Sequence, residues 1–370
     1  MNHQRLENLR AQMAAQGLDG IALVPGPNML YFSGVNSHVS ERPIVLFLPA
    51  ADEPAIVIPT LEAMKARDNG ISENRIYGWT DQEGYEAAFQ QVSSDLQLSG
   101  WTLGVEALYM RVLEHEILQR HASGITTVHA EPMIYALRAI KDEMEIAAME
   151  KAVLVAESAM SSLLPQIEIG MSEKQVAAIL TQELLSRGAD SMAFGPIVAS
   201  GPNSASPHAW PTDRPLQEGD LLVIDWGVYV AGYPSDITRT FAVGEIDAEL
   251  KLVYETVKQA NMQGKMTARP GSTGQEVDRA ARKIIEDAGY GEQFFHRLGH
   301  GLGLEVHEEP NMVEGNLNPL HPGNVFTVEP GIYLTGRGGV RIEDDVVVTQ
   351  DGCRSLTSFS RELITVGVNG

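Results

Sequence analysis

Cysteine, positive charge and long apolar runs are all scarce in this chain of 370 residues. The single cysteine, Cys353, excludes an internal disulfide framework and a cysteine-based zinc site, and it fits a reducing compartment. The 27 Lys and Arg residues against 49 Asp and Glu give a formal net charge of -22, which disfavours nucleic acid as a partner because phosphates require a basic surface. No apolar run has the length of a signal peptide core or a transmembrane helix. We therefore expect a cytoplasmic protein that has no membrane partner.

Two kinds of region follow one another along the chain. The first alternates helix and strand signals: a leucine and methionine stripe that ends at Gly17 predicts a helix, and short segments such as IALV and PIVLFL predict strands. A long helical pattern, LRAIKDEMEIAAMEKAVLVAESAM, starts at about residue 137 and leads into the second region. The sequence therefore predicts an α+β protein with an N-terminal α/β domain over residues 1–135 and a second domain over residues 136–370.

The second region repeats itself. GMSEKQVAAILTQELLSRG (170–188) and GSTGQEVDRAARKIIEDAG (271–289) have equal length, and each carries the capping box that begins a helix. Further on, GDLLVIDWGVYVAG (219–232) matches GNVFTVEPGIYLTG (323–336) position by position in its pattern, which places an acid at the same strand position in both. Two such matches in the same order and at nearly the same offset indicate an internal duplication. A duplicated unit of this kind predicts a site on a pseudo-two-fold axis.

Four carboxylates lie in the two repeated hairpins. Asp225 and Asp236 flank a predicted two-residue turn, so their side chains point to the same face of the hairpin. Glu329 and Glu343 flank the segment TGRGG, and a glycine loop of odd length again places both side chains on one face. Carboxylates that converge in apolar strands repel one another unless protons or cations compensate their charge.

A histidine in a glycine-rich segment indicates that cations, rather than protons, compensate the charges of the four acids. The segment RLGHGLGLEVHEEP contains His300, and its glycines disfavour a helix, so it predicts a loop or a bent strand that passes close to its neighbours. Hard divalent ions prefer carboxylate oxygens, and an imidazole suits Zn, Mn or Co. Four carboxylates and one histidine are enough ligands for two ions about 3.5–4 Å apart. The sequence therefore predicts a site for two divalent metal ions per chain, with Mn, Co and Zn all open.

Two further histidines precede the hairpins. His208 lies in the polar segment SGPNSASPHAWP ahead of the first hairpin, and His307 lies at the matching place ahead of the second. Both positions are too polar for core histidines. We expect these side chains to polarise, or hydrogen-bond to, a bound carbonyl group.

Five motifs together resemble a known family. The segments IDWG, SDITRTF, HRLGHGLGLEVHE, VEPGIY and VRIEDD, in this order, are similar to those of the pita-bread metallopeptidases, and within them to the prolidase and aminopeptidase P branch. The resemblance spans essentially the whole chain. It implies a creatinase-like domain up to about residue 135, followed by a pita-bread catalytic domain over residues 136–370.

The resemblance also implies a role for each predicted ligand. Asp225 would bind one ion, His300 and Glu329 would bind the other, and Asp236 and Glu343 would bridge the two. The nucleophile would be a water molecule held between the ions and ionised near neutral pH. Glu329 would also carry the proton of this water to the leaving nitrogen.

Other residues are implied to act on the substrate. His208 and His307 resemble the histidines that contact the scissile carbonyl and the tetrahedral intermediate. Arg341 and Arg297 resemble arginines that orient ligands or meet a substrate carboxylate. His38, in the segment NSHVSERP of the first domain, resembles a specificity residue that reaches the site of the neighbouring subunit in a homodimer.

The implied activity is hydrolysis of the bond between an N-terminal residue and proline, in dipeptides (Xaa-Pro dipeptidase) or in short peptides (aminopeptidase). The alternative is a family member recruited to the hydrolysis or lysis of a non-peptide small molecule, as a creatinase-like amide hydrolase or a lyase. A metal-free creatinase or a non-enzymatic binding module would be expected to have lost ligands, whereas all five are present. Methionine aminopeptidases share the ligands but usually lack an N-terminal domain of this size.

Overall fold

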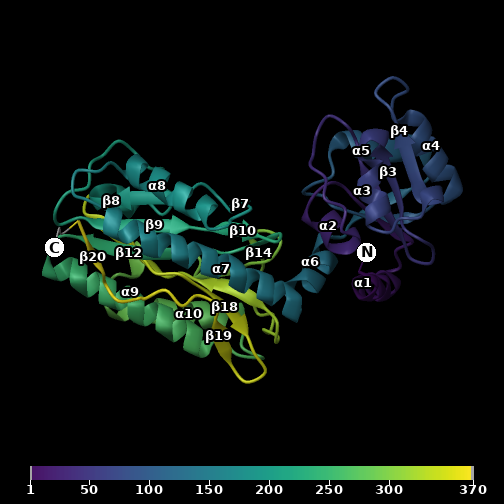
Figure 1. Ribbon diagram of the computed structural model, residues 1–370. Coiled ribbons are helices and arrows are strands. Elements are labelled where there is room, and N and C mark those ends of the chain that lie inside the picture. The colour runs from purple at the N-terminus through teal and green to yellow at the C-terminus, as the bar shows by residue number, and fades with distance from the viewer. Residues whose placement is uncertain (1, 368–370) are drawn as a thin grey trace. The chain divides into compact units, whose positions relative to one another are not determined.

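The computed structural model describes residues 2–367 and consists of two compact units, residues 1–138 and 139–370 (Figure 1). The division between the units follows residue 138, whereas the sequence-based expectation set the domain boundary after residue 135. Each unit has its own sheets and its own core, and each is described by itself.

The first unit is built on one six-stranded mixed sheet, in the order β4-β3-β2-β1-β5-β6. The strands are β1 (Gly20–Leu23), β2 (Val45–Pro49), β3 (Ala55–Pro59), β4 (Ile76–Trp79), β5 (Thr102–Val105) and β6 (Thr126–His129). The helices are α1 (His3–Gln16), α2 (Pro27–Ser33), α3 (Ala63–Asp68), α4 (Glu86–Asp95), α5 (Val112–His121) and α6 (Glu131–Ala139). The apolar sides of α4 and α5 pack against the sheet, where Phe89 and Ile117 join a core that includes Phe47. As predicted, α1 buries its leucine and methionine stripe and ends at Gly17, which has a left-handed φ of 67°.

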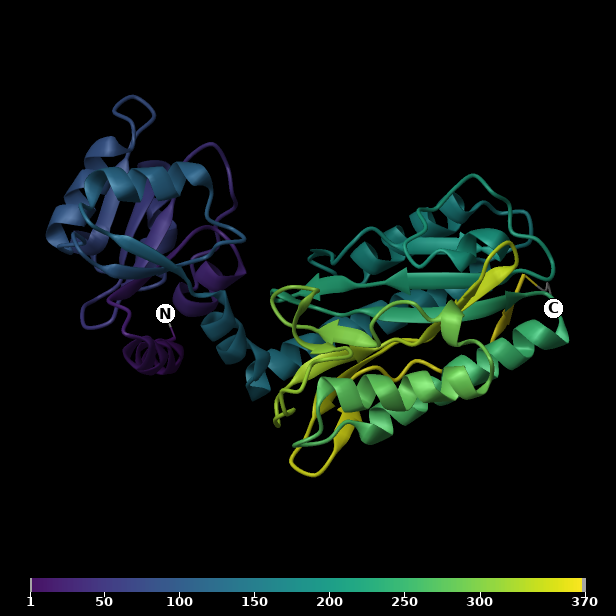
Figure 2. The same ribbon diagram turned by 180° about the vertical axis from the view of Figure 1, so that it is seen from behind.

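In the second unit, long helices flank a set of strands (Figures 1 and 2). The helices are α7 (Glu143–Leu163), α8 (Glu173–Ser186), α9 (Ala248–Thr267) and α10 (Gly274–Asp287). The larger sheets have the orders β20-β12-β9-β8 and β14-β13-β15-β18-β19. Their strands are β8 (Ile197–Ser200), β9 (Leu221–Trp226), β12 (Ile237–Val243), β13 (Gly299–Gly301), β14 (Glu308–Met312), β15 (Val325–Val328), β18 (Asp344–Val348), β19 (Cys353–Ser355) and β20 (Thr365–Val366). Shorter strands complete the two hairpins: β10 (Val228–Val230) and β11 (Tyr233–Pro234) in the first, and β16 (Gly331–Leu334) and β17 (Gly338–Arg341) in the second. A further short strand, β7 (Ser191–Met192), pairs with β10.

The internal duplication is present in the structure. Both predicted capping boxes are formed, at the starts of α8 and α10. The residue that caps each helix also pairs with a proline before the following hairpin, as Ser172 with Pro215 and Thr273 with Pro319. One apolar core joins α7 and α8 to β9 and β12, and a second joins α9 and α10 to β15 and β18. The α+β class and the duplicated architecture are therefore confirmed.

The long helix expected from about residue 137 is wrong in one respect, because the structure breaks it into α6 and α7. Ile140 leaves the helical path and forms a bridge with Asn324. Asp142 then begins α7 as its N-cap, in a capping box with Glu145. The Asp142 side chain accepts a hydrogen bond from the backbone N–H of Glu145, which would otherwise lose its helical partner at the break. The break in the helix therefore costs little free energy. Within residues 2–367, no helix is both long enough and apolar enough to cross a membrane.

Candidate metal centre

The first hairpin places two acids on one face of its strands. Asp225 of β9 pairs with Thr238 of β12, so Asp236, two residues before Thr238, lies diagonally across from Asp225 on the same side. The turn falls at Ala231 and Gly232, whose φ angles are 53° and 82°. Two positive φ angles are typical of the tight turns that join such strands. The predicted geometry of this hairpin is confirmed.

The second hairpin does the same for two glutamates. The ladder between β15 and β18 and the ladder between β16 and β17 keep one common register. This register sets Glu329 opposite Glu343, and residues 335–337 form the loop between the strands. The odd length of the loop places both side chains on one face, as the glycine pattern predicted.

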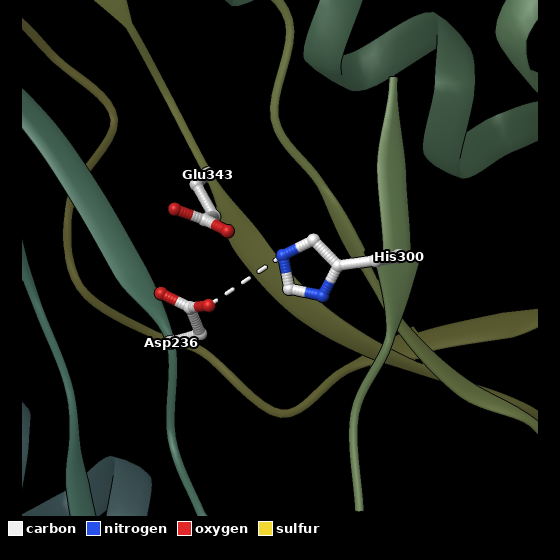
Figure 3. A group of neighbouring side chains, drawn as sticks. All are labelled: Asp236, His300 and Glu343. Carbon is white, nitrogen blue, oxygen red and sulfur yellow. Dashed lines mark ion pairs between the residues drawn. The ribbon is translucent and has the colours of Figure 1, made fainter. Parts of the chain in front are cut away.

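Two of these acids and His300 come together in a buried cluster. One ligand atom each from Asp236, His300 and Glu343 lies within 4.8 Å of the other two, and Figure 3 shows the three side chains pointing toward one another. His300 belongs to β13, whereas Asp236 and Glu343 directly precede β12 and β18. His300 Nε2 lies 3.6 Å from an oxygen of Asp236, which is the dashed contact in Figure 3, and 3.3 Å from an oxygen of Glu329. The spacing is that of side chains that could share a cation.

The cluster lies in a cavity of about 540 Å³. Every residue that the sequence assigned to the site lines this cavity, except one; the lining members are His208, Asp225, Asp236, Arg297, His300, His307, Glu329, Arg341 and Glu343. The exception is His38, which belongs to the first unit and is exposed there. Its predicted role in a neighbouring subunit's site stays a prediction.

Glycines let the strand of His300 pass between its neighbours. A Cβ atom on Gly299 would lie 1.9 Å from the carbonyl oxygen of Thr327, and one on Gly301 would lie 2.2 Å from that of Glu309. No larger residue fits at either place, which explains the glycine-rich segment. The Nδ1 of His300 is 3.1 Å from the Gly301 carbonyl oxygen and must donate a proton to it. The Nε2 atom therefore carries the lone pair and points at the carboxylates, as a metal ligand requires.

Burial dominates the electrostatics of the four acids. It raises the pKa of Asp225, and together with repulsion from neighbouring acids it raises the pKa of Asp236 and of Glu343 well above their ordinary values. Burial also raises the pKa of Glu329 to about 7. A low dielectric surrounding disfavours the charged form of each acid, unless a cation offsets the cost.

The donor set fits divalent cations. Asp225 Oδ1 is buried and has no hydrogen-bond partner among residues 2–367, so one carboxylate oxygen is left for a ligand. Burial lowers the pKa of His300 well below its ordinary value, which keeps the imidazole neutral. Carboxylate oxygens with one neutral imidazole are the donors that Mn, Co and Zn accept.

Arg341 contacts one of the four hairpin acids, Asp225, rather than open space. Its Nη2 atom lies 2.7 Å from an oxygen of Asp225, and its Nε and Nη1 atoms donate to the hydroxyls of Thr238 and Tyr333, each at 3.1 Å. A buried guanidinium in this position orients the Asp225 carboxylate. The sequence left ligand orientation and substrate binding open for this arginine, and these contacts favour ligand orientation.

Arg297 differs from Arg341. It is half-buried at the cavity wall and donates to the side chain of Asn311. Within the part of the chain that the structure describes, it forms no ion pair with a carboxylate. Its charge is therefore available to an anionic group in the cavity.

The sequence pattern of the metallopeptidase family M24 matches residues 147–350, and that of the creatinase/prolidase N-terminal domain matches residues 5–140. The chain belongs to metallopeptidase family M24. Its sequence is 34% identical to a Xaa-Pro dipeptidase of Pyrococcus horikoshii, over 98% of this chain and 99% of that protein. The solved structure of a prolidase from Thermococcus sibiricus has a TM-score of 0.92 and 36% identity, covering 99% of this chain and all of that one. The structure of dipeptidase PepE from Mycobacterium ulcerans has a TM-score of 0.90 and 37% identity, covering 98% and 97%.

Membership of M24 confirms the predicted pita-bread family and its prolidase-like branch. The chain is a metal-dependent hydrolase of the peptidase class. The two domain patterns follow one another in the order that the sequence predicted.

Two residues of the cavity, His296 and Tyr333, were assigned no role from the sequence. His296 Nε2 lies 3.0 Å from the hydroxyl of Tyr333, and both side chains line the cavity. Burial lowers the pKa of His296 to about 4, so its ring is neutral at pH 7. A signal for Tyr333 was present, because it aligns with Tyr229 in the repeat, whereas no repeat or motif position marked His296 for a role.

The two predicted substrate histidines of this M24 chain lie on loops at the cavity. The ring of His307 packs edge-on against that of His300, with 4.1 Å between their centroids. His208 is exposed and lies on the loop between β8 and β9. This loop is held by the buried carboxylate of Glu173, which accepts hydrogen bonds from the amides of Ser200 at 2.7 Å and Thr212 at 2.9 Å.

Proposed function

We propose that this protein is a Xaa-Pro peptidase that works with two divalent metal ions. The observation that carries the proposal is the cavity, in which buried acids and a neutral imidazole lie together with a cationic side chain and two loop histidines. The Xaa-Pro dipeptidase and prolidase relatives support the same chemistry. Neither they nor the cavity favours the small-molecule hydrolase or lyase alternative.

The ligand assignment is the one that the resemblance to the family implies, and the cluster of Asp236, His300 and Glu343 supports it. Asp225 would hold one ion, His300 with Glu329 the other, and Asp236 and Glu343 would be shared. Bound ions of this kind supply an activated water and polarise the scissile carbonyl. The Arg341 guanidinium keeps the Asp225 carboxylate in place.

Other side chains of the cavity bind the substrate. His307 and His208, which line the cavity, donate hydrogen bonds to the carbonyl oxygen of the scissile bond, where negative charge develops during hydrolysis. Glu329 holds the proton that the leaving nitrogen takes up. Arg297 meets the free carboxylate of a dipeptide, because no carboxylate of the described chain pairs with it.

Proline suits such a cavity for a physical reason. Its peptide nitrogen carries no hydrogen and its φ is fixed, so a pocket can select it by shape and by the absent donor. We expect peptides with alanine in place of proline to be cleaved far more slowly.

The test combines metal content with a substrate panel. Elemental analysis of the purified protein should approach about two divalent ions per chain, and chelated protein should lose activity until Mn, Co or Zn is restored. Xaa-Pro dipeptides and Xaa-Pro-Xaa peptides are then compared with their Xaa-Ala counterparts. Asp236→Asn should lose metal and activity, whereas Asp287→Asn, at an exposed ion pair, serves as the matched control. Full activity without metal, or equal cleavage of Xaa-Ala and Xaa-Pro, contradicts the proposal.

Assembly and location belong to the same proposal. We infer a homodimer in which His38 serves the partner's site, and a cytoplasmic location is supported by the single cysteine. His38→Ala should raise KM without changing the metal content, and sedimentation should report a dimer. A monomer of full activity contradicts this part alone.

A further inference from the structure

A buried ion pair lies beside the loop that carries His307. Lys141 Nζ is 2.6 Å from Glu308 Oε1, and the two side chains are only 1% and 4% exposed. Taking two charges out of water costs about as much as their attraction returns, so such a pair is a poor source of stability. A pair of this kind has a strong effect on geometry instead, because neither charge can move without losing its partner.

The acid of the pair supports the loop directly. Glu308 follows His307 in the chain and begins β14. A Cβ atom on Gly303 would lie 2.0 Å from Glu308 Oε1, so the backbone of the loop rests on this carboxylate. The other oxygen faces the amide of Glu305 at 3.5 Å. Residues 303–307 therefore fold around the Glu308 carboxylate.

The base of the pair is anchored on residues 323–324, directly before the strand that leads to Glu329, a proposed metal ligand. The Lys141 amide donates to the carbonyl oxygen of Gly323 at 2.8 Å. Next to it, Ile140 bridges Asn324, and the Asn324 side chain donates to the carbonyl oxygen of Ala139 at 2.9 Å. Asn324 directly precedes β15, which runs to Glu329. Lys141 thus connects the loop of His307 to the strand of a proposed ligand.

We propose that the ion pair of Lys141 and Glu308 is a positioning device for His307. Neither residue lines the cavity, so the pair acts through the loop and touches no substrate. It holds the imidazole of His307 against that of His300, where it can meet a scissile carbonyl. The inference rests on the proposed peptidase function for its effect on rate, but its effect on the loop does not.

The first measurement needs neither substrate nor metal. Lys141→Met removes the cation but keeps an unbranched chain, and Glu308→Gln keeps the volume and one acceptor oxygen of the acid. Hydrogen exchange followed by mass spectrometry should show faster exchange over residues 302–308 in both variants. Lys141→Arg, which keeps a cation, should restore part of the protection. Lys283→Met, at an exposed pair with Asp287, is the control and should leave exchange in this loop unchanged.

The second measurement separates positioning from a general loss of structure. With a Xaa-Pro dipeptide, Lys141→Met should lower kcat by about 10-fold to 100-fold, because a small displacement of a catalytic group has effects of this size. KM and metal content should change little. In the background of His307→Ala, the same substitution should lower kcat by less than about twofold, since the group that the pair positions is already gone.

Two results overturn the inference. One is unchanged exchange over residues 302–308 in both Lys141→Met and Glu308→Gln. The other is an equal fall in kcat with and without His307, which would show a structural role unrelated to this side chain. If the unmodified protein cleaves no Xaa-Pro peptide, the proposed function fails, and the exchange measurement still tests the positioning of the loop.

Discussion

Replacing Glu106 by glutamine should remove a pH dependence of stability from the N-terminal unit. Glu106 follows β5, is fully buried, and accepts hydrogen bonds from the Val24 amide at 2.7 Å and the Asn28 side chain at 2.8 Å. Burial raises its pKa from 4.5 to about 7, although the two hydrogen bonds lower the pKa by a smaller amount. The carboxyl group is therefore protonated in the folded unit at pH values where it is ionised in the unfolded chain.

The sign and the size of the effect follow from linkage. Below pH 4.5 the group is protonated in both states, so its contribution to stability is complete. As the pH rises from 4.5 to about 7, only the unfolded chain releases the proton, and the contribution is lost. The pKa difference corresponds to about 3 kcal/mol of unfolding free energy. Glutamine has no proton to release, so this loss should be absent in Glu106→Gln.

Hydrogen exchange of β1 and β5 in the full chain measures this free energy at several pH values. The unfolding free energy of the wild type is compared with that of the variant at each pH. The substitution also changes hydrogen bonds, but this cost is the same at every pH and does not affect how the difference varies with pH. Between pH 4.5 and 7.5, we expect the wild type to lose about 3 kcal/mol relative to Glu106→Gln. A difference that stays flat over this range would refute the reasoning, since it would mean that Glu106 is ionised in the folded unit.

The remaining predictions concern the site. His300→Ala should lose bound metal, whereas His307→Ala should keep it and lower kcat by about 10²–10³-fold, the usual effect of removing a donor to a developing oxyanion; equal metal loss in the two variants contradicts these roles. Arg297→Lys should raise KM for dipeptides more than for longer peptides, because the fork-shaped contact with a free carboxylate is lost. Steady-state kinetics on both substrate classes measure this, and an equal rise in KM for both classes would contradict the assigned role of Arg297. Glu173→Gln should lower the unfolding free energy by about 1–3 kcal/mol, because one of the two oxygens that accept hydrogen bonds from backbone N–H groups becomes an NH2 group, which cannot accept them. Urea unfolding measures this change, and unchanged stability would show that the His208 loop does not depend on Glu173.

The sequence predicted the structure correctly where the geometry depends on residues that are close in the chain. The alternation of side chains along a strand has a period of two, so the spacing of Asp225 and Asp236 around their turn already placed both on one face. The same rule placed Glu329 and Glu343 on one face, and the structure sets them opposite each other. Capping boxes mark helix starts through contacts within one turn, and both predicted ones were present.

Local rules failed where one signal competed with another. Helix-favouring residues continue without a break from about residue 137, yet Asp142 caps a new helix and Ile140 forms a bridge with Asn324, far along the chain. A partner that distant cannot be inferred from periodicity. The role of Arg341 stayed open for the same reason, because its choice between Asp225 and a substrate depends on how two hairpins pack.

The sequence by itself determined the class of chemistry: which acids share a face, that a histidine among glycines accompanies them, and that their charges need cations. Only the tertiary structure decided which oxygen of Asp225 is left without a partner, that His296 bonds to Tyr333, and that Lys141 lies under the loop of His307. The physical reason is the range of the interactions. Strand alternation and helix capping act over a few residues, whereas buried hydrogen bonds and ion pairs join residues that meet only when the sheets and loops have packed.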